Sequence, residues 1–159
     1  MSFGKEVGFM EDRFTQGFIA GIVGWLPQFL FTYIMYGIHL TKFRYVDFAA
    51  IITYNHRPQG FLQLLFSEMV VILVASFLGA VFAMLIKVIQ SPAIFLKGLL
   101  YGAISWFLIY VVFSLFKVKG IYGEPDFSTV FINLTGVFIW GFSTAWTLLI
   151  LNRRFGVKN

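Results

Sequence analysis

The chain has 159 residues, of which 59% are hydrophobic and 12% charged, and its formal net charge is +5. Soluble domains carry roughly a quarter charged residues, so this composition excludes an ordinary soluble globular protein, and its apolar content excludes a disordered chain. Cysteine is absent, which excludes disulfides and thiolate metal sites.

The apolar residues form four long runs. About 20 residues of helix, rising about 1.5 Å each, cross a hydrocarbon core about 30 Å thick. We therefore expect an all-α integral membrane protein, a four-helix bundle that forms one transmembrane domain over residues 1–159. The predicted spans cover about residues 17–41, 61–86, 93–116 and 128–151.

The first run contains a proline, which interrupts the hydrogen bonding of a helix. Pro27 has no backbone N–H and crowds the carbonyl four residues back, so we predict a bend near Trp25. The freed carbonyl can be met by Gln28 or Thr32. The alternative is a hinge or a half-helix binding site. The run is too long for a cleaved signal peptide, so we expect it to remain in the mature protein.

The longest connection between spans, residues 42–60, mixes aromatic, aliphatic and charged residues. This mixture predicts a short helix over about residues 46–54 that lies in the membrane interface and caps the bundle, followed by a turn at residues 57–60. Asp47 is expected to start this helix, and Asp126 the fourth span, because an aspartate side chain accepts hydrogen bonds from free backbone N–H groups.

The two halves of the chain resemble each other. A shift of 79 residues places Asp47 on Asp126. Each half is then one helical hairpin, and units with an even number of crossings repeat in parallel, about an axis along the membrane normal. The alternative is chance similarity between apolar segments. In the spans themselves, a shift of 81 residues places Gly17 on Gly98, Gly21 on Gly102, and Trp25 on Trp106.

The repeated motif holds two glycines four residues apart. Small residues let helix backbones approach closely, which is a main source of helix association in lipid. We expect Gly17 and Gly21 to meet Gly98 and Gly102 in a crossing of the first and third spans. The same faces are alternatively a dimer contact, or they have no special role, since glycine is common in membrane helices.

Polar groups within the spans are the candidates for function, because they are costly in lipid. Glu68 is the one charged residue of the second span, and it lies near the ends that carry His39 and Arg57, so pairing with either is open. Together with Asn133 these residues form a candidate proton or cation path. The alternative is that Glu68 anchors a helix end at the interface. We expect Asn133 to make an interhelical hydrogen bond rather than to bind a ligand.

No motif indicates catalysis. The sequence has no phosphate-binding glycine loop, no His-Glu-x-x-His and no convincing Ser/His/Asp arrangement. His39 and His56 as axial haem ligands are a minor alternative. Lipid-facing Phe and interfacial Tyr and Trp account for the aromatic content without a pigment or quinone. We therefore expect no enzyme activity, no catalytic residue, no metal and no cofactor.

The basic residues predict the orientation. Loops that carry more Lys and Arg lie on the cytoplasmic side. This favours a multi-pass protein of the cell membrane with both termini cytoplasmic, and anionic lipids account for the basic charge without nucleic acid. The side of the termini would hold Lys5, Arg13, Lys87, Lys97, Arg153, Arg154 and Lys158, and the opposite side Lys42, Arg44, Arg57, Lys117 and Lys119.

The arrangement of these features resembles the YqhR-type membrane proteins of spore-forming Gram-positive bacteria, over about residues 14–154. The resemblance implies a four-helix integral membrane protein and brings no catalytic residues to this chain. It is carried by Gly17 and Gly21, the turn 57–60, the run 97–106, and Asp126 with Gly136 and Gly141.

From these features we expect a non-catalytic integral membrane subunit. Its partners would be the lipid bilayer and further copies of the chain or a larger membrane complex, held by the small-residue faces. The alternative is a small oligomeric channel or transporter with a path near Glu68. An enzyme acting on lipid ranks third, because no convergent acid–base pair is visible.

Overall fold

The computed structural model describes residues 12–88, 92–115 and 126–155. Over these residues it holds five helices and no strand, so the predicted all-α class is confirmed for the described part of the chain. Four of the helices are long and apolar enough to cross a membrane, and α2, with 10 residues, is not. The bounds are α1 (Arg13–Gly37), α2 (Tyr45–Tyr54), α3 (Phe61–Val88), α4 (Ile94–Leu115) and α5 (Phe127–Phe155).

Aspartate side chains cap the first turns of α1 and α5. Asp12 accepts a hydrogen bond from the Thr15 N–H (2.9 Å), and Asp126 accepts one from the Thr129 N–H (3.1 Å). The hydrogen bonds from these threonines lower the pKa of both carboxyl groups. Each carboxylate satisfies a backbone donor that has no partner within its helix. The expected role of Asp126 at the start of the last helix is therefore confirmed.

α1 ends at Gly37, four residues before the predicted end of the first span. Two backbone hydrogen bonds close its last turn, from the His39 N–H to Tyr36 O (3.1 Å) and from the Leu40 N–H to Met35 O (3.0 Å). This pattern is a Schellman motif, whose second-last residue has a left-handed backbone. His39 is that residue, with φ 59°, so it ends the helix.

Pro27 lies inside α1, which continues through it without interruption. The Thr32 hydroxyl donates to the carbonyl of Gln28 (2.8 Å). The Gln28 side chain interacts with Tyr45. Both candidates for the carbonyl that Pro27 frees thus have other partners, and a bend near Trp25 stays a prediction.

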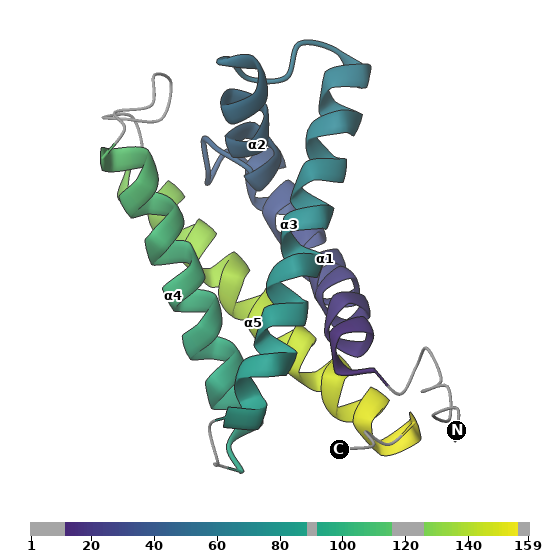
Figure 1. Cartoon of the computed structure of the whole chain (residues 1–159). Helices are drawn as coiled ribbons and strands as arrows, with labels where there is room; N and C mark the ends of the chain where they lie inside the picture. Colours follow the sequence, from purple (N-terminus) through teal and green to yellow (C-terminus); the bar gives the residue numbers. More distant parts are fainter. Residues whose placement is uncertain (1–11, 89–91, 116–125, 156–159) are drawn as a thin grey trace.

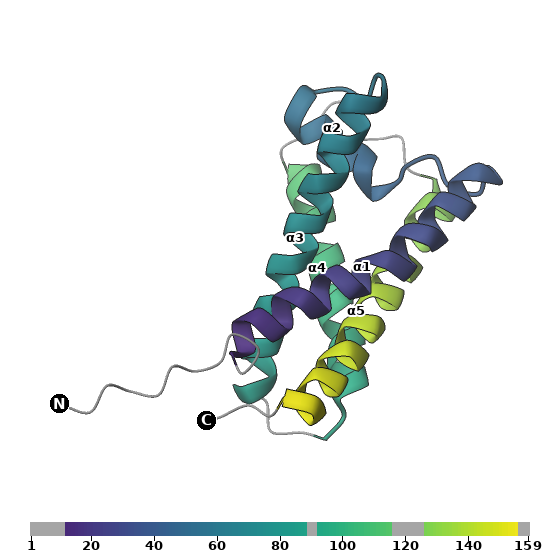
Figure 2. The ribbon, with the colours of Figure 1, turned by 90° about the vertical axis from the view of Figure 1, so that its right-hand side faces the viewer.

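The helices pack in a chain of neighbours. α1 lies between α3 and α5, α4 packs along α5, and α3 and α4 touch little (Figures 1 and 2). α1 begins and α5 ends at one end of the molecule, where α3 also ends and α4 begins. α2 lies at the opposite end, against α3.

The backbones of α1 and α3 are in direct contact. Gly79 of α3 lies against Gly17 and Gly21 of α1, and a methyl group on Gly79 would come within 2.7 Å of the Gly21 Cα. One turn further, Ala83 lies beside Gly17, where a methyl group on the glycine would be 2.6 Å from the Ala83 Cβ. Any larger side chain at these glycines would force the two helices apart.

α4 and α5 are joined in the same way. Gly98 faces Gly141 and Ala145, and Gly102 faces Val137. The glycines of the third span therefore contact the fourth span, and the predicted crossing of the first and third spans is wrong. Because α3 and α5 cover both glycine faces, these faces are also not open to a second copy of the chain.

The contact between α1 and α5 joins the two hairpins. The Trp140 indole N–H donates to the carbonyl of Gly21 (3.3 Å). A methyl group on Gly24 would lie 3.0 Å from the Trp140 carbonyl oxygen, so α5 also approaches the α1 backbone closely. Trp140 is 3% exposed, and this tryptophan therefore belongs to the core rather than to an interfacial belt.

We expect Gly79→Ala and Gly141→Ala to destabilise the fold by about 1–3 kcal/mol each, because the added methyl group meets backbone atoms that cannot move aside. Denaturation in detergent micelles, followed by circular dichroism, measures this. Gly37→Ala is the matched control, since nothing lies within 4 Å of its added methyl group and alanine favours helix. An equal effect of all three substitutions would contradict this packing.

Candidate functional site

A cavity of about 760 Å³ lies between α3 and α4. The two helices diverge from the end of α3 and the start of α4 toward α2 (Figure 1). Residues of both helices line the cavity. We call it the α3–α4 cleft. Its side walls are mostly apolar and include Val70, Val71 and Val74 from α3, and Trp106, Ile109 and Val112 from α4.

Large side chains close the base of the cleft. The Tyr101 hydroxyl donates to the carbonyl of Leu78 (2.9 Å), which ties α4 to α3. The Tyr101 ring packs on Phe82 and Trp140, with ring centroids 5.2 and 6.0 Å apart. α3 and α4 thus meet through large side chains here, whereas glycine lets the backbones of α1 and α5 meet directly.

α2 forms the roof of the cleft. Phe48 of α2 packs against Tyr110 and Phe113 of α4, with ring centroids 5.9 and 5.5 Å apart. Phe43, in the connection before α2, is fully buried in the same cluster, and Ile51 is 2% exposed. The expected capping role of this short helix is thus visible in its contacts with α3 and α4.

The back wall of the cleft carries a polar network. The Tyr45 hydroxyl donates to the backbone carbonyl of Asn133, and the Asn133 side-chain amide donates to the Tyr110 hydroxyl (3.3 Å). Burial raises the pKa of Tyr45 well above its usual value, so the hydroxyl stays a donor. Asn133 is fully buried and makes the interhelical hydrogen bond that its position predicted.

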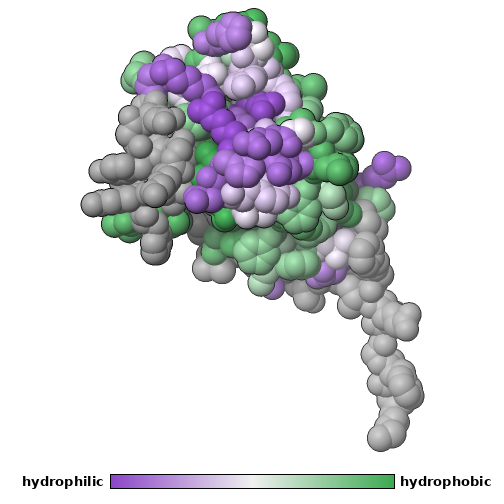
Figure 3. Space-filling view, turned by 90° about the horizontal axis from the view of Figure 1, so that it is seen from above, coloured by the Kyte–Doolittle hydropathy of each residue, from purple (hydrophilic) through white to green (hydrophobic). Residues whose placement is uncertain are grey.

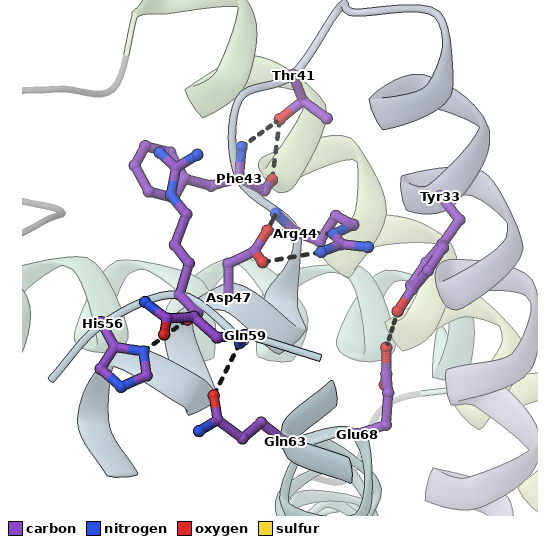
Figure 4. Close-up of polar contacts among 10 residues, drawn as sticks. Tyr33, Thr41, Phe43, Arg44, Asp47, His56, Gln59, Gln63 and Glu68 are labelled. Carbon is purple, nitrogen blue, oxygen red and sulfur yellow. Dashed lines mark hydrogen bonds and ion pairs between the residues drawn. The ribbon is translucent and has the colours of Figure 1, made fainter. Parts of the chain in front are cut away.

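A second polar group lies under α2, on the other side of α3. The Glu68 carboxylate accepts a hydrogen bond of 2.7 Å from the Tyr33 hydroxyl, so that α3 and α1 are joined there (Figure 4). The Trp25 side chain interacts with the same carboxylate. The adjoining cavity has a volume of about 10 Å³, which is room for about one water molecule.

Arg44 and Asp47 form an ion pair above this group. The Arg44 guanidinium donates to Asp47 (3.0 Å) and lies 4.9 Å from the Tyr33 ring centroid. Burial alone would lower the pKa of Arg44, but hydrogen bonds and the charge of Asp47 outweigh it and raise that pKa. Asp47 is the third residue of α2 and accepts the backbone N–H of Arg44 (2.7 Å). Asp47 therefore takes part in starting α2, as predicted, but from within its first turn, whereas Asp126 precedes α5. The match between the two aspartates stays a prediction.

The structure does not gather the predicted path residues around Glu68. His39 is exposed at the end of α1. The Arg57 guanidinium lies over the Phe43 ring, 4.1 Å from its centroid. Asn133 belongs to the polar network of the cleft. Each of these residues thus has its own surroundings.

Hydrophilic residues gather at the end of the molecule that carries α2. Figure 3 looks onto this end and shows a hydrophilic band with apolar residues around it. Lys42 pairs with Asp126 here at 3.4 Å, and both side chains are about half exposed. This distribution fits a membrane interface at the α2 end.

The cleft was not predicted from the sequence, because its walls use the same residue types that face lipid. One signal was available. The shift of 81 residues places Tyr101 on Ala20, so a large residue stands in the second half where the first half has a small one. At this position the Tyr101 side chain contacts Leu78 and Phe82 of α3, so a large side chain lies between the two helices at the base of the cleft.

Comparison with protein-family models, curated proteins and solved structures found no match for the chain. The resemblance to YqhR-type proteins therefore stays a prediction. Among the described residues, no three His, Asp or Glu side chains gather as a metal site would require.

We expect Tyr33→Phe to destabilise the fold by about 1–3 kcal/mol, because it removes the donor of a half-buried carboxylate. Glu68→Gln should cost less, since its amide oxygen still accepts from Tyr33. Denaturation midpoints in detergent measure both effects. Tyr36→Phe is the matched control on the exposed side of α1. Equal losses for Tyr33→Phe and Tyr36→Phe would show that the hydrogen bond to Glu68 contributes nothing.

Proposed function

We propose that the chain is a non-catalytic integral membrane protein whose α3–α4 cleft holds the hydrocarbon chain of a membrane lipid. The observation that carries this proposal is a cavity of about 760 Å³ with apolar side walls, a closed base and a roof. Its volume falls within the range of about 300–1,000 Å³ that is typical of small-molecule sites.

The volume favours a lipid chain over a helix of another protein. One turn of helix rises 5.4 Å and is about 10–12 Å wide, so it occupies roughly 400–600 Å³. The cleft would hold less than two such turns. A membrane-spanning helix has five or more turns and would leave most of its length outside, whereas a thin hydrocarbon chain fits between the walls.

Membrane insertion in our proposal rests on α1, α3, α4 and α5, which are long and apolar enough to cross. We also propose that both termini face the cytoplasm. At the end where α1 begins, the described residues carry more Lys and Arg than at the α2 end, which is the pattern of a cytoplasmic side. The first group is Arg13, Lys87, Lys97, Arg153 and Arg154, and the second is Lys42, Arg44 and Arg57.

We further propose that the two hairpins are a repeat. Gly79 and Ala83 contact Gly17 as Gly141 and Ala145 contact Gly98, which supports the parallel repeat. A twofold arrangement would match the α1–α5 contact with one between α3 and α4. The cleft lies where that second contact is missing. A lipid chain would fill the place of the missing helix contact.

Other functions draw less support from the contacts. Association of copies through the glycine faces is not needed, since each face is covered within the chain. A channel or transporter near Glu68 would need a continuous polar path, and the cavity beside this carboxylate has a volume of about 10 Å³. We therefore place the functional site in the cleft.

Val74→Trp should fill the cleft and reduce the phospholipid that copurifies with the protein by several-fold. Leu73→Trp is the matched control, because Leu73 is 60% exposed on the same helix and does not line the cleft. Native mass spectrometry of the protein released from lipid nanodiscs counts the bound lipids. Ile109→Trp, on the opposite wall, tests the same idea independently. Undiminished lipid on both cleft variants, with circular dichroism unchanged, would refute the proposal.

A further inference from the structure

The α3–α4 cleft is larger than one acyl chain. An apolar cavity of about 150 Å³ inside a protein holds one benzene molecule, which corresponds to roughly 25 Å³ for each carbon atom. At this density, the cleft volume of about 760 Å³ has room for roughly 30 carbon atoms. A palmitoyl chain, which spans about one half of a hydrocarbon core, has about 16 carbon atoms. The cleft therefore has the volume of about two such chains.

The extra volume of the cleft is width rather than length. Its α3 wall runs from Val70 to Leu78 and its α4 wall from Ser105 to Phe113, and eight residues of helix rise about 12 Å. Dividing the volume of about 760 Å³ by this depth gives a mean cross-section of roughly 60 Å². A palmitoyl chain of roughly 400 Å³ that spans about 15 Å has a cross-section of roughly 27 Å². Two chains therefore fit side by side.

The closed base keeps a single longer chain from using this volume. The Tyr101 hydroxyl donates to the carbonyl of Leu78 (2.9 Å), and the Tyr101 ring packs on Phe82 with ring centroids 5.2 Å apart. A chain that enters from the α2 side therefore ends at these side chains. A longer chain would have to fold back on itself, whereas a second chain beside the first can stay extended.

The cleft has an inner side and an outer side. On the inner side it is lined by Val137 and Trp140 of α5, which are 5% and 3% exposed. On the outer side it is lined by Val74 of α3 and Leu108 of α4, which are 47% and 56% exposed. One chain would thus pack against α5, and a second chain would cover the first and enter sideways between α3 and α4.

We propose that the cleft binds one diacyl phospholipid from the leaflet on the α2 side and holds both of its acyl chains. This inference rests on the proposed function and adds the class of lipid. Linked chains favour this ligand, because the second chain enters without a further loss of translational freedom once the first is bound. The glycerol and the headgroup lie outside the cleft beside α2, where Ile52 lines the opening and is 68% exposed.

The test compares two lipids with the same headgroup, dipalmitoyl phosphatidylcholine and palmitoyl lysophosphatidylcholine, which differ in the number of chains. Each lipid is added to the protein in detergent micelles, and native mass spectrometry counts the bound copies. Copies that the double variant Val74→Trp with Ile109→Trp fails to bind are counted as cleft lipids. The cleft of the unchanged chain should bind one copy of the diacyl lipid or two of the lysolipid. The diacyl lipid should bind about tenfold more tightly, because its chains are linked.

Val74→Trp alone tests the width of the cleft, because Val74 lies on its outer side. This substitution should reduce the lysolipid in the cleft from two copies to one and remove most of the preference for the diacyl lipid. Leu73→Trp is the matched control, since Leu73 is exposed on the same helix and does not line the cleft. It should leave both the number of copies and the preference unchanged.

The outcomes separate the two proposals. A single lysolipid in the cleft of the unchanged chain, or equal affinity for the two lipids, would overturn the binding of both chains while bound lipid still supported the cleft. Equal binding of each lipid by the unchanged chain and the double variant, with circular dichroism unchanged, would overturn the proposed function as well.

Discussion

Direct contact between helix backbones is the constraint on which the rest of this structure depends. In α1 and α3 it is made at Gly17, Gly21 and Gly79, and in α4 and α5 at Gly98 and Gly141. In the bilayer that we propose for this chain, no hydrophobic force acts between apolar helices, so close packing of backbones must supply much of the association energy. These glycines thus decide which helices are neighbours within each hairpin.

The cleft follows from how the two hairpins meet. Gly24 lets α1 and α5 approach closely, and Trp140 adds a hydrogen bond between them. On the other side, Tyr101 and Phe82 stand between α4 and α3. α1 and α5 are therefore in direct backbone contact, whereas α3 and α4 meet through large side chains at one end only, and α2 closes the other end of the gap between them. The cavity is therefore a mostly apolar site, and its shape is set by how the surrounding side chains pack in the folded protein.

The sequence predicted the helices well, because length and apolar composition decide them. Helix ends depend on local chemistry. The sequence predicts Asp126 as a cap at the start of the last helix, and the structure confirms it. The left-handed backbone of His39 at the end of α1 was not predicted, because glycine is the residue that usually takes this conformation at a helix end. The helix that packs against each glycine pair was predicted wrongly. The spacing of two glycines indicates which face of a helix packs closely, but not which other helix packs against that face. Tyr33 as partner of Glu68 was missed for a similar reason, as their contact joins residues 35 positions apart.

α3 and α4 are separated toward α2 and meet where α3 ends and α4 begins. The chain has no cysteine, so pairs of introduced cysteines can be spin-labelled without background. Double electron–electron resonance in lipid nanodiscs would compare Met69 with Val112, near α2, and Leu85 with Leu96, near the end of α3 and the start of α4; all four side chains are exposed. We expect a clearly longer distance between the labels of the first pair. Equal distances, or a shorter one near α2, would contradict it.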